Sequence, residues 1–405
     1  MHIALVSPAW PPGNYANGIV TYVGCMRKEL LSQGHRVSIF SGQVGKDQRD
    51  PDVHAVRLST LERTRQFLAS RVLDRHPSLF DGGEHIARVI LRQHARNPID
   101  VIEMEETFGW AGEVARTSNI PVVVKLHGPA FLHLVEEELR TAFGAERAWR
   151  EGLELARLPV IVAPSRSTLH RTVSHYSLRS TILEHVVNPV AIPADFTLWS
   201  LDSCNRYTVL FVGRFDKIKG GDLILGAFQR LLSREPRLNL VFVGPDPGLI
   251  LPNGERVDIH TFIASMGDDA VRRAVSYRGR LGAAEIGALR AAALVTVNAS
   301  RHESQGYTVL EAMLQGCPVV CTDGSGSSES IQHEVTGLLA PSGDPVALAT
   351  QIARIVDDPQ FGAALGAAGR DYVLKHHSPT TVVKQALDVY QRAIDLHRTR
   401  GAVRK

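Results

Sequence analysis

The chain has 405 residues, of which 44% are hydrophobic and 21% are charged. This length corresponds to two or three domains of about 150 residues. The composition is that of a globular protein, which excludes a disordered chain, a collagen-like repeat and a coiled coil. The 45 basic and 42 acidic residues nearly balance, so the charge gives no indication of nucleic-acid binding.

Targeting segments and disulfides are not indicated. Every apolar run is much shorter than the roughly 20 residues of a membrane-spanning helix, and the sequence opens on a strand pattern without a basic, cleavable leader. We therefore expect a cytoplasmic protein with no integral membrane segment. Four cysteines are too few for a disulfide scaffold, and we interpret them as reduced and structural: Cys25, Cys204, Cys317 and Cys321.

The first half of the chain alternates strand and helix patterns. A strand over His2–Ser7 precedes a loop over Pro8–Asn17 and a helix over Gly18–Ser32. One face of that helix is predicted to carry Ile19, Tyr22, Val23, Met26, Leu30 and Leu31. Further strands are predicted at His35–Phe40, Val53–Leu58, Asp100–Glu103, Pro121–Leu126, Val160–Ala163 and Thr181–Val187.

The alternation pauses at Asn188–Pro193 and then resumes. Strands are predicted at Tyr207–Val212, Leu238–Gly244, Leu294–Asn298 and Pro318–Thr322, and a last helix at Thr380–His397. Strands that alternate with helices indicate parallel sheets covered on both faces. We therefore predict an α/β chain of two doubly wound, Rossmann-like domains joined near residue 190. Ligands of such domains bind at the carboxyl ends of the strands.

The segment from Glu303 to Glu311 is the strongest local signal, since it follows a strand and opens a helix. The amides of Gly306, Tyr307 and Thr308 are expected in the first helical turn, where unsatisfied N–H groups and the helix dipole attract phosphate. The Glu311 carboxylate suits the paired hydroxyls of a ribose, and Glu303 suits a sugar hydroxyl. The alternative is that the two glutamates are a surface residue and a helix cap.

Two cations follow another predicted strand. Gly213 and Arg214 end the strand pattern, and Lys219 stands five residues later, before a helix. Arginine offers a planar fork of donors and lysine a mobile point charge, which together suit a diphosphate. Taken alone, the pair is more typical of two solvated loop cations.

Other polar residues follow the strands of the first half. His127 ends one strand, which places it on the ligand side of the sheet, although a packed histidine is an equal interpretation. Glu105 and Glu106 follow the preceding strand and suit an acceptor pocket, although their position is more typical of a charged loop. The loop that ends with Asn17 and Gly18 resembles a phosphate-binding turn without being a Gly-x-Gly-x-x-Gly motif.

Taken together and in this order, the motifs resemble glycosyltransferase family 4 over most of the chain. The matching segments are Pro11–Tyr22, Gly34-His35, His127-Gly128, Ala163–Ser165, Gly213-Arg214, Lys219-Gly220, Glu303–Val320 and Thr336-Gly337. The resemblance implies a GT-B fold, in which two Rossmann-like domains face across a cleft and a C-terminal helix crosses back to the first. The expected domains are residues 1–188, completed by about 380–397, and residues 189–379.

The resemblance also implies residue roles. Arg214 and Lys219 would bind the donor diphosphate, Glu311 the ribose and Glu303 a sugar hydroxyl, while His127 would contact the transferred sugar. The remaining donor-binding residues are expected to be Gly18, Gly213, Leu281, Gln305, Gly306, Tyr307 and Thr308, with Leu281 beside the base. Asn17, Glu105 and Glu106 are expected at the acceptor.

The implied reaction is transfer of a sugar from a UDP- or GDP-sugar to an acceptor hydroxyl, with retention of anomeric configuration. We expect no metal and no cofactor, because preorganised cations and helix amides can stabilise the leaving diphosphate and no Asp-x-Asp pair is placed to hold a metal. The alternatives are a nucleotide-sugar epimerase of similar two-domain shape and a non-catalytic nucleotide-sugar binding protein.

Two segments depart from the family pattern. Asn17-Gly18 stands where two glycines are common, and Ser325–Glu329 stands where Gly-Gly-x-Pro-Glu is common. A third segment, Leu61–Phe80, is basic and apolar, and its interpretation is either a helix packed on its own domain or one in weak peripheral contact with an anionic membrane, the latter only for a lipid acceptor.

Overall fold

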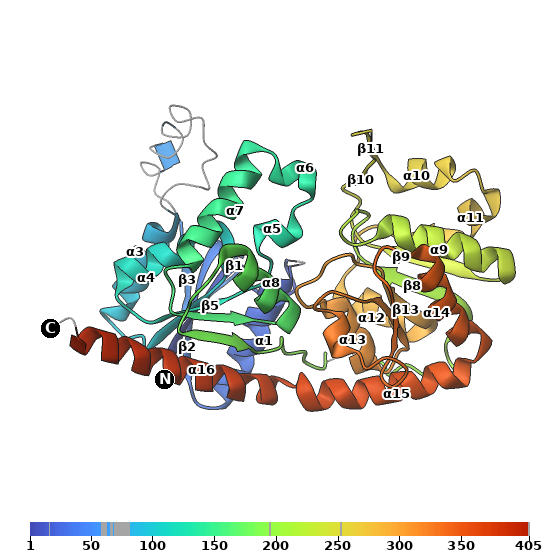
Figure 1. Ribbon diagram of the computed structural model, residues 1–405. Coiled ribbons are helices and arrows are strands. Elements are labelled where there is room, and N and C mark those ends of the chain that lie inside the picture. The colour runs from blue at the N-terminus through green and yellow to red at the C-terminus, as the bar shows by residue number, and fades with distance from the viewer. Residues whose placement is uncertain are drawn as a thin grey trace. The chain divides into compact units, whose positions relative to one another are not determined.

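The computed structural model describes residues 1–15, 17–57, 63–64, 68, 82–193, 196–251 and 253–403 (Figure 1). The chain divides into two compact units. Unit 1 comprises Met1–Pro189 and Pro379–Lys405, and unit 2 comprises Val190–Ser378. Each unit contains one parallel sheet with helices on its faces, as the alternation of strand and helix patterns predicts.

Unit 1 is built on a sheet that has seven strands among its described residues, in the order β3-β2-β1-β4-β5-β6-β7. All neighbouring strands run parallel. The order changes direction at β1, and the ends of parallel strands at such a point form the usual ligand crevice. The strands are β1 (His2–Trp10), β2 (Arg36–Val44), β3 (Val53–Ala55), β4 (Val101–Met104), β5 (Val122–Lys125), β6 (Val160–Ala163) and β7 (Ile182–His185).

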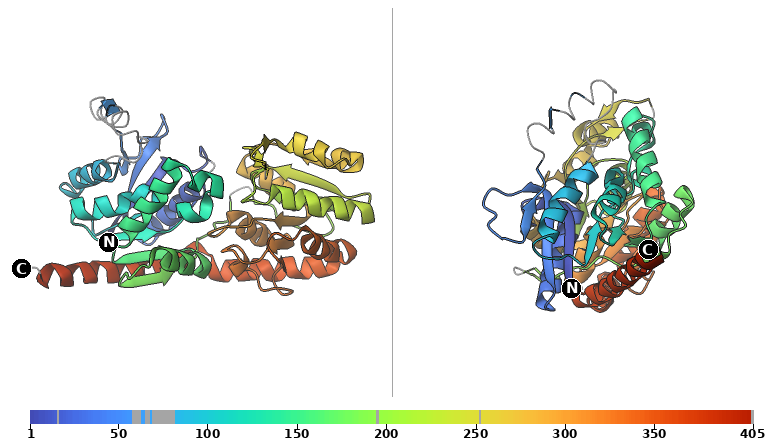
Figure 2. Two further views of the ribbon diagram at one scale, coloured as in Figure 1. Left: turned by 45° about the horizontal axis from the view of Figure 1, so that its top comes forward. Right: turned by 90° about the vertical axis from the view of Figure 1, so that its left-hand side faces the viewer.

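The helices of unit 1 cover both faces of this sheet. The last helix of the chain, α16, belongs to this unit and packs against α1, β4 and β5, and it runs along the unit in both views of Figure 2. The C-terminal helix is thus confirmed as part of the first domain. The helices are α1 (Gly18–Ser32), α3 (Gly82–His94), η2 (Thr107–Gly109), α4 (Trp110–Ser118), α5 (Ala130–His133), α6 (Glu136–Leu139), α7 (Ala142–Leu155), α8 (Arg166–Tyr176) and α16 (Pro379–Val403).

Unit 2 has a six-stranded parallel sheet over its described residues, in the order β12-β9-β8-β13-β14-β15. These strands are β8 (Asn205–Val212), β9 (Asn239–Val243), β12 (Val275–Tyr277), β13 (Ala293–Asn298), β14 (Val319–Thr322) and β15 (Leu338–Ala340). A separate antiparallel pair joins β10 (Leu249–Ile250) to β11 (Arg256–Val257). The helices are α9 (Gly221–Arg234), α10 (Ile259–Ser265), α11 (Asp269–Ala274), α12 (Ala283–Ala292), α13 (Tyr307–Gln315), η3 (Ser328–Ser330), α14 (Pro345–Asp357) and α15 (Pro359–His376).

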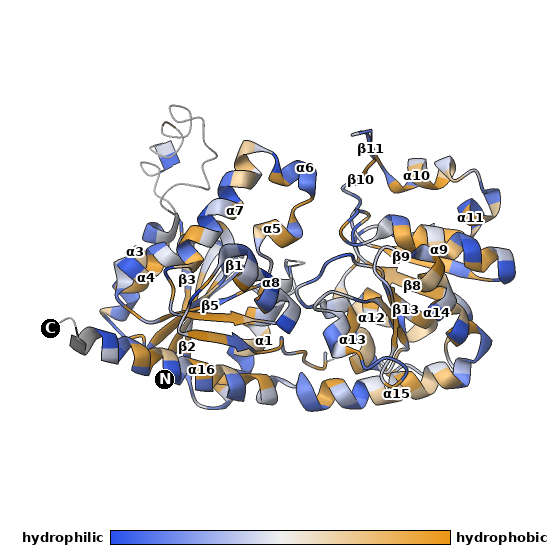
Figure 3. Cartoon of the chain, in the orientation of Figure 1, coloured by the Kyte–Doolittle hydropathy of each residue, from blue (hydrophilic) through white to orange (hydrophobic). Residues whose placement is uncertain are grey.

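Each unit has its own apolar core. The cores lie between the sheet and its helices, and Figure 3 shows the central strands in the apolar colour while the helices alternate between the two colours. Val124, Ile102 and Phe40 lie in the core of unit 1, and Phe211 and Phe242 lie in that of unit 2. Buried on both faces, the parallel strands form continuous apolar runs, which is why the sequence reveals them.

The predicted elements agree closely with the observed ones where the apolar pattern is long. The helix over Gly18–Ser32 and the strand over Val160–Ala163 have the predicted bounds. The first strand continues to Trp10, so Pro8 lies in a strand instead of the predicted loop. Beyond Leu5, β1 is paired with β2 alone, and a proline without an N–H is tolerated at such an unpaired side. The short strands β12 and β15 were not predicted, because three residues show too little periodicity.

Helix α1 buries a slightly different face from the predicted one. Tyr22, Val23, Met26 and Leu30 are buried as expected, but Leu31 is 44% exposed, and Val20 is buried in addition. The four cysteines form no disulfide in the structure, and Cys317 and Cys321 are buried.

Candidate functional site

The candidate donor site in unit 2 is formed by the loops that follow β8 and β13 and by the start of α13. In the first loop, Asp216 organises both predicted cations. Its Oδ2 lies 2.7 Å from Nε of Arg214, and its Oδ1 accepts the backbone N–H of Lys219 at 2.7 Å. Asp216 thus fixes the spacing of Arg214 and Lys219. We did not identify it from the sequence, although an acid between two cations in one short loop is a usable signal.

The loop after β8 packs tightly against the end of β13. Gly220 has φ +72°, and a Cβ on it would lie 1.9 Å from the carbonyl oxygen of Ala299. Only glycine combines this left-handed backbone with such a close approach. The two loops are therefore held together at Gly220, immediately after Lys219.

Lys219 forms an ion pair with Glu303, through Nζ and Oε1. The same carboxylate oxygen accepts the hydroxyl of Ser300 at 3.3 Å, and Glu303 is only 9% exposed. The structure therefore brings together two predicted site residues that are 84 positions apart. An ammonium group has three N–H donors, so Lys219 can contact an anion while it remains bound to Glu303.

The start of α13 differs from the prediction in one respect. Gly306 is the N-cap residue, and its amide donates to the hydroxyl of Ser327 at 2.9 Å. A Cβ on Gly306 would lie 2.6 Å from that hydroxyl oxygen. The expected free amide of Gly306 is thus already bonded, and its partner comes from the Ser325–Glu329 segment that departs from the family pattern. Thr308 is the second residue of α13, and its hydroxyl donates to the carbonyl of Val212 at 3.4 Å.

Glu311 is held in place by a buried arginine. Oε2 of Glu311 accepts an N–H of Arg290 at 3.0 Å, and the side chains are 42% and 4% exposed, respectively. Glu311 is one helical turn after Tyr307 and Thr308, so all three lie on one side of α13. A half-exposed carboxylate backed by a buried guanidinium is well suited to accept hydroxyl groups. Arg290, on α12, was missed because its partner lies 21 positions away.

The other predicted donor residues are also in unit 2. Gly213 begins the loop after β8, and its N–H donates to the carbonyl of Val243. Gln305 is buried at 7% exposure. Leu281 packs against a small apolar cluster that includes Leu210 and Val243.

In unit 1, His127 follows β5, and its loop is fixed by Glu106. Oε2 of Glu106 accepts the amide of His127 at 2.9 Å, and Oε1 accepts that of Gly128 at 2.6 Å. Glu106 is 1% exposed. The structure therefore gives Glu106 a different place from the predicted acceptor contact, since both of its oxygens are used to hold the histidine loop. Burial, with the negative charges of Glu151 and Glu105, raises the pKa of Glu106 to about 8.

His127 is kept neutral by its surroundings. Its ring meets the ring of Tyr22 edge-on, with the centroids 4.9 Å apart. Burial and then the charge of Lys125 lower the pKa of His127 to about 3. Lys125 is itself buried, with its amine on the carbonyl of Val186, and burial lowers the pKa of its amine to about 7.

Asn17 and Glu105, two of the predicted acceptor residues, line one cavity of about 790 Å³ in unit 1. Asn17 caps α1, because its Oδ1 accepts the amide of Ile19 at 2.8 Å. Gly18 is the first residue of α1, immediately beside Asn17. Glu105 follows β4 and accepts the hydroxyl of Thr107 at 2.8 Å.

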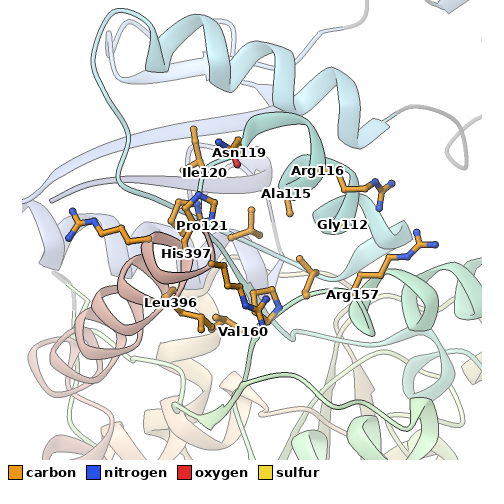
Figure 4. Close-up of a pocket in the computed structure, with 16 residues that line it drawn as sticks. Gly112, Ala115, Arg116, Asn119, Ile120, Pro121, Arg157, Val160, Leu396 and His397 are labelled. Atoms are coloured by element: carbon orange, nitrogen blue, oxygen red, sulfur yellow. The ribbon is translucent and has the colours of Figure 1, made fainter. Parts of the chain in front are cut away.

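A second cavity, of about 810 Å³, lies at the opposite ends of the strands of unit 1 (Figure 4). Pro121 and Val160 mark the starts of β5 and β6, and Leu396 and His397 come from α16. Two of its four lining arginines, Arg116 and Arg157, bind the carboxylate of Glu154. None of the predicted site residues lines this cavity.

The structure leaves two expectations untested, namely membrane contact and the absence of a metal ion. Apart from 63–64 and 68, the Leu61–Phe80 segment lies outside the described residues, so membrane contact stays a prediction. Within the described ranges no helix is long and apolar enough to cross a membrane. Among the same residues there is no group of three His, Cys, Asp or Glu side chains arranged to hold a metal ion.

The fold is that of several solved structures. Sucrose-phosphate synthase from Thermosynechococcus elongatus superposes with a TM-score of 0.74 at 21% identity, covering 98% of this chain and 99% of that one. Anabaena HepE in complex with UDP-glucose superposes with a TM-score of 0.70 at 17% identity, covering 97% and 100%. The two Rossmann-like units and these neighbours define the GT-B class.

Family models give the more specific assignment. The one described as "Glycosyltransferase Family 4" matches residues 16–192, and "Glycosyl transferases group 1" matches residues 206–358. The chain therefore belongs to glycosyltransferase family 4.

Curated relatives fall into two groups by coverage. D-inositol 3-phosphate glycosyltransferase from Salinispora tropica is 33% identical over 48% of this chain, but the match spans only 40% of that protein. The Arthrobacter enzyme of the same name is 27% identical over 89% of this chain and 87% of its own length. MMP alpha-(1->4)-mannosyltransferase from Mycolicibacterium hassiacum is 25% identical over 97% and 98%.

Proposed function

We propose that the protein transfers a sugar from a nucleoside diphosphate sugar to an acceptor hydroxyl, with retention of configuration and without a metal ion. The observation that carries this proposal is the convergence of Arg214, Lys219 and Glu303 with the start of α13 in unit 2. Two cations, two carboxylates and a helix N-terminus match the parts of such a donor: its diphosphate, its ribose and its sugar.

The arrangement of the cluster supports a division of roles. Arg214 and Lys219, spaced by Asp216, would bind the diphosphate. Glu311, supported by Arg290, would accept the ribose hydroxyls. Further donor contacts would come from Gly213, Leu281, Gln305, Gly306, Tyr307 and Thr308 in unit 2, and from Gly18 in unit 1.

Glu303, whose Oε1 is bound by Lys219 and Ser300, would bind a sugar hydroxyl. His127 would contact the transferred sugar. Since its ring is neutral, it can donate one hydrogen bond and accept another without adding charge to the reacting centre.

The proposed step forms a bond from the acceptor oxygen to the anomeric carbon and breaks the bond from that carbon to the diphosphate. The leaving diphosphate takes both electrons of the broken bond, and the acceptor proton passes to a phosphate oxygen on the same face. Negative charge on the leaving group grows in the transition state, so preorganised cations and N–H donors stabilise that state more than the ground state. Attack from the face of departure gives retention.

The nucleotide is proposed to be a uridine or guanosine diphosphate. HepE has been solved in complex with UDP, with UDP and glucose, and with UDP-glucose. These complexes support uridine as the first base to test. The named relatives act on inositol 3-phosphate or transfer mannose, as their names state.

A donor panel tests this proposal. Thermal unfolding would be measured with UDP, GDP and their glucose, N-acetylglucosamine and mannose conjugates, because a ligand that binds the native state raises its stability. At least one conjugate is expected to raise the melting temperature, and Arg214→Ala is expected to reduce the rise at a fixed donor concentration. The matched control is Arg234→Ala, which removes an arginine that is 61% exposed and paired with Asp357.

Incubation of that donor with and without acceptors separates transfer from epimerisation. A transferase releases nucleoside diphosphate and requires an acceptor for rapid turnover, whereas an epimerase changes the free donor. Failure of every donor to bind, or conversion of the donor to its epimer, would overturn the proposal.

A further inference from the structure

The cavity of unit 1 that contains Asn17 and Glu105 has the size of a small-molecule site. Its volume of about 790 Å³ lies within the roughly 300–1,000 Å³ of typical ligand pockets. It lies where β1, β2 and β4 end, on the side of the sheet from which His127 follows β5. This is the side at which doubly wound sheets bind ligands.

Much of the wall is aromatic or aliphatic. Phe40, Phe108 and Trp110 line the cavity together with Ile19 and Met104. The rings of Phe108 and Trp110 lie next to each other, with centroids 4.9 Å apart. Such a surface binds an apolar body or the C–H face of a ring, and it gives a charged group nothing to pair with.

The backbone holds Phe108 in an unusual conformation. Its φ is +58°, a left-handed value that is a genuine outlier for a bulky residue. The amide of Phe108 donates to Glu151 at 3.3 Å, and the guanidinium of Arg147 lies 5.0 Å from its ring centroid. Neighbouring groups therefore maintain a strained residue that forms part of the cavity wall, and strain of this kind is concentrated at functional sites.

The described polar side chains of the cavity include one carboxylate. Asn17, Thr107, Ser7, Gln43 and His85 accompany the carboxylate of Glu105, and none of the described lining residues is a lysine or an arginine. Arg147, whose positive charge acts on Glu105, is bound to the Glu151 carboxylate at 2.9 Å.

We propose that this cavity selects an uncharged acceptor that carries its hydroxyl on an apolar or aromatic body, and that it rejects a phosphorylated one. This inference rests on the proposed function and makes it more specific. Asn17 and Glu105 would hydrogen-bond hydroxyl groups of the acceptor, while Phe108 and Trp110 cover its apolar face. A phosphate would lie beside Glu105, with no lysine or arginine among the described lining residues to compensate it, and such like-charge contact selects against the wrong partner.

A matched pair of compounds tests the charge preference directly. p-Nitrophenyl α-D-glucopyranoside and its 6-phosphate differ only in the phosphate group. Their binding to the full chain would be measured by saturation-transfer NMR and by titration, in the presence of UDP or GDP, whichever the donor panel identifies. We expect the neutral compound to bind, and the phosphate to weaken binding about tenfold or more. Equal or tighter binding of the phosphorylated compound, or no binding of either compound, overturns the inference.

Phe108→Gly tests the site itself. Glycine adopts the left-handed backbone without strain, so the fold is expected to persist while the aromatic wall is lost. Binding of the neutral compound should weaken about fivefold or more, as expected for a lost aromatic contact. Trp149→Ala is the matched control, since Trp149 is 60% exposed and does not line the cavity, and it should leave binding unchanged. Unchanged binding in Phe108→Gly places the acceptor elsewhere and overturns the inference.

Failure of this inference is distinguishable from failure of the proposed function. The donor thermal shift and acceptor-dependent release of nucleoside diphosphate depend on unit 2 and on catalysis, whichever acceptor class is used. Donor binding together with transfer to a phosphorylated acceptor would keep the proposed function and reject the acceptor class.

Discussion

Lys219 and Glu303 form an ion pair that joins the loop after β8 to the loop after β13. The two residues are 84 positions apart, and each was predicted separately as a donor contact. The pair leaves the Lys219 ammonium two further N–H donors. One ion pair would thus position a diphosphate contact and a sugar contact relative to each other.

Loss of either donor cation should slow the reaction strongly. Lys219→Ala and Arg214→Ala should each reduce turnover about 10²–10³-fold, the usual effect of removing one preorganised electrostatic donor. Arg214→Lys should remain impaired, because an ammonium group cannot reproduce the guanidinium fork. The measurement is kcat with saturating donor, with Arg234→Ala as the surface control. Near wild-type turnover in both alanine variants would place the donor phosphates elsewhere.

Glu311→Ala should weaken donor binding more than it slows chemistry. A ribose contact exists both before and during transfer, so its loss raises KM for the donor and leaves kcat largely unchanged. Arg290→Met should produce a smaller change in the same direction, since Glu311 stays but loses its buried partner. Unchanged donor affinity combined with a large fall in turnover of Glu311→Ala would contradict the ribose assignment.

The free energy of unfolding tests whether Glu106 holds the His127 loop. Glu106→Ala removes the acceptor of the His127 and Gly128 amides, and an unsatisfied buried donor costs about 1–3 kcal/mol. The free energy of unfolding, measured with urea, should therefore fall by about that amount for each amide. Glu136→Ala is the control, because the Glu136 side chain is 72% exposed. If Glu106→Ala unfolds like Glu136→Ala while only the acceptor KM rises, the predicted acceptor contact is right and the structural assignment is wrong.

His127 should make the protein less stable in acid. Its pKa is lowered from 6.5 to about 3 in the native state, so between these values the unfolded chain binds a proton that the native protein does not. Stability contributed by this site therefore falls as the pH falls from about 6.5 to 3, by at most about 1.4 kcal/mol per pH unit. Urea unfolding of wild type and His127→Asn across this range should show the difference between them changing in favour of the variant. A pH-independent difference would mean that the pKa of His127 is the same in the native and unfolded protein.

The predictable part of the structure is the part fixed by local pattern. The bounds of α1 follow from a capping asparagine and a long apolar face, and β6 follows from a buried apolar run. Glu303 and Lys219 were found because each stands beside a strand end. Asp216, Arg290 and Ser327 were missed as partners, since a contact between polar side chains depends on how loops meet in space.

Glu106 illustrates the same limit for a residue that was noticed. Its position after β4 predicts a place at the carboxyl edge of the sheet, and the structure confirms that place. The two adjacent side chains nevertheless point in different directions, because Glu105 lines the cavity while Glu106 turns to the His127 loop. Sequence position alone does not show which of two neighbouring carboxylates is available to a ligand.

The stereochemistry of transfer without a metal ion is the most direct test of a retaining, metal-independent glycosyltransferase. The protein would be treated with EDTA and incubated with the donor identified by thermal shift and with p-nitrophenyl α-D-glucopyranoside, and the new glycosidic bond would be followed by proton NMR. We expect release of nucleoside diphosphate and a product with the anomeric configuration of the donor, at an unchanged rate. An inverted product, or transfer that stops with EDTA and returns with magnesium, would contradict the proposal.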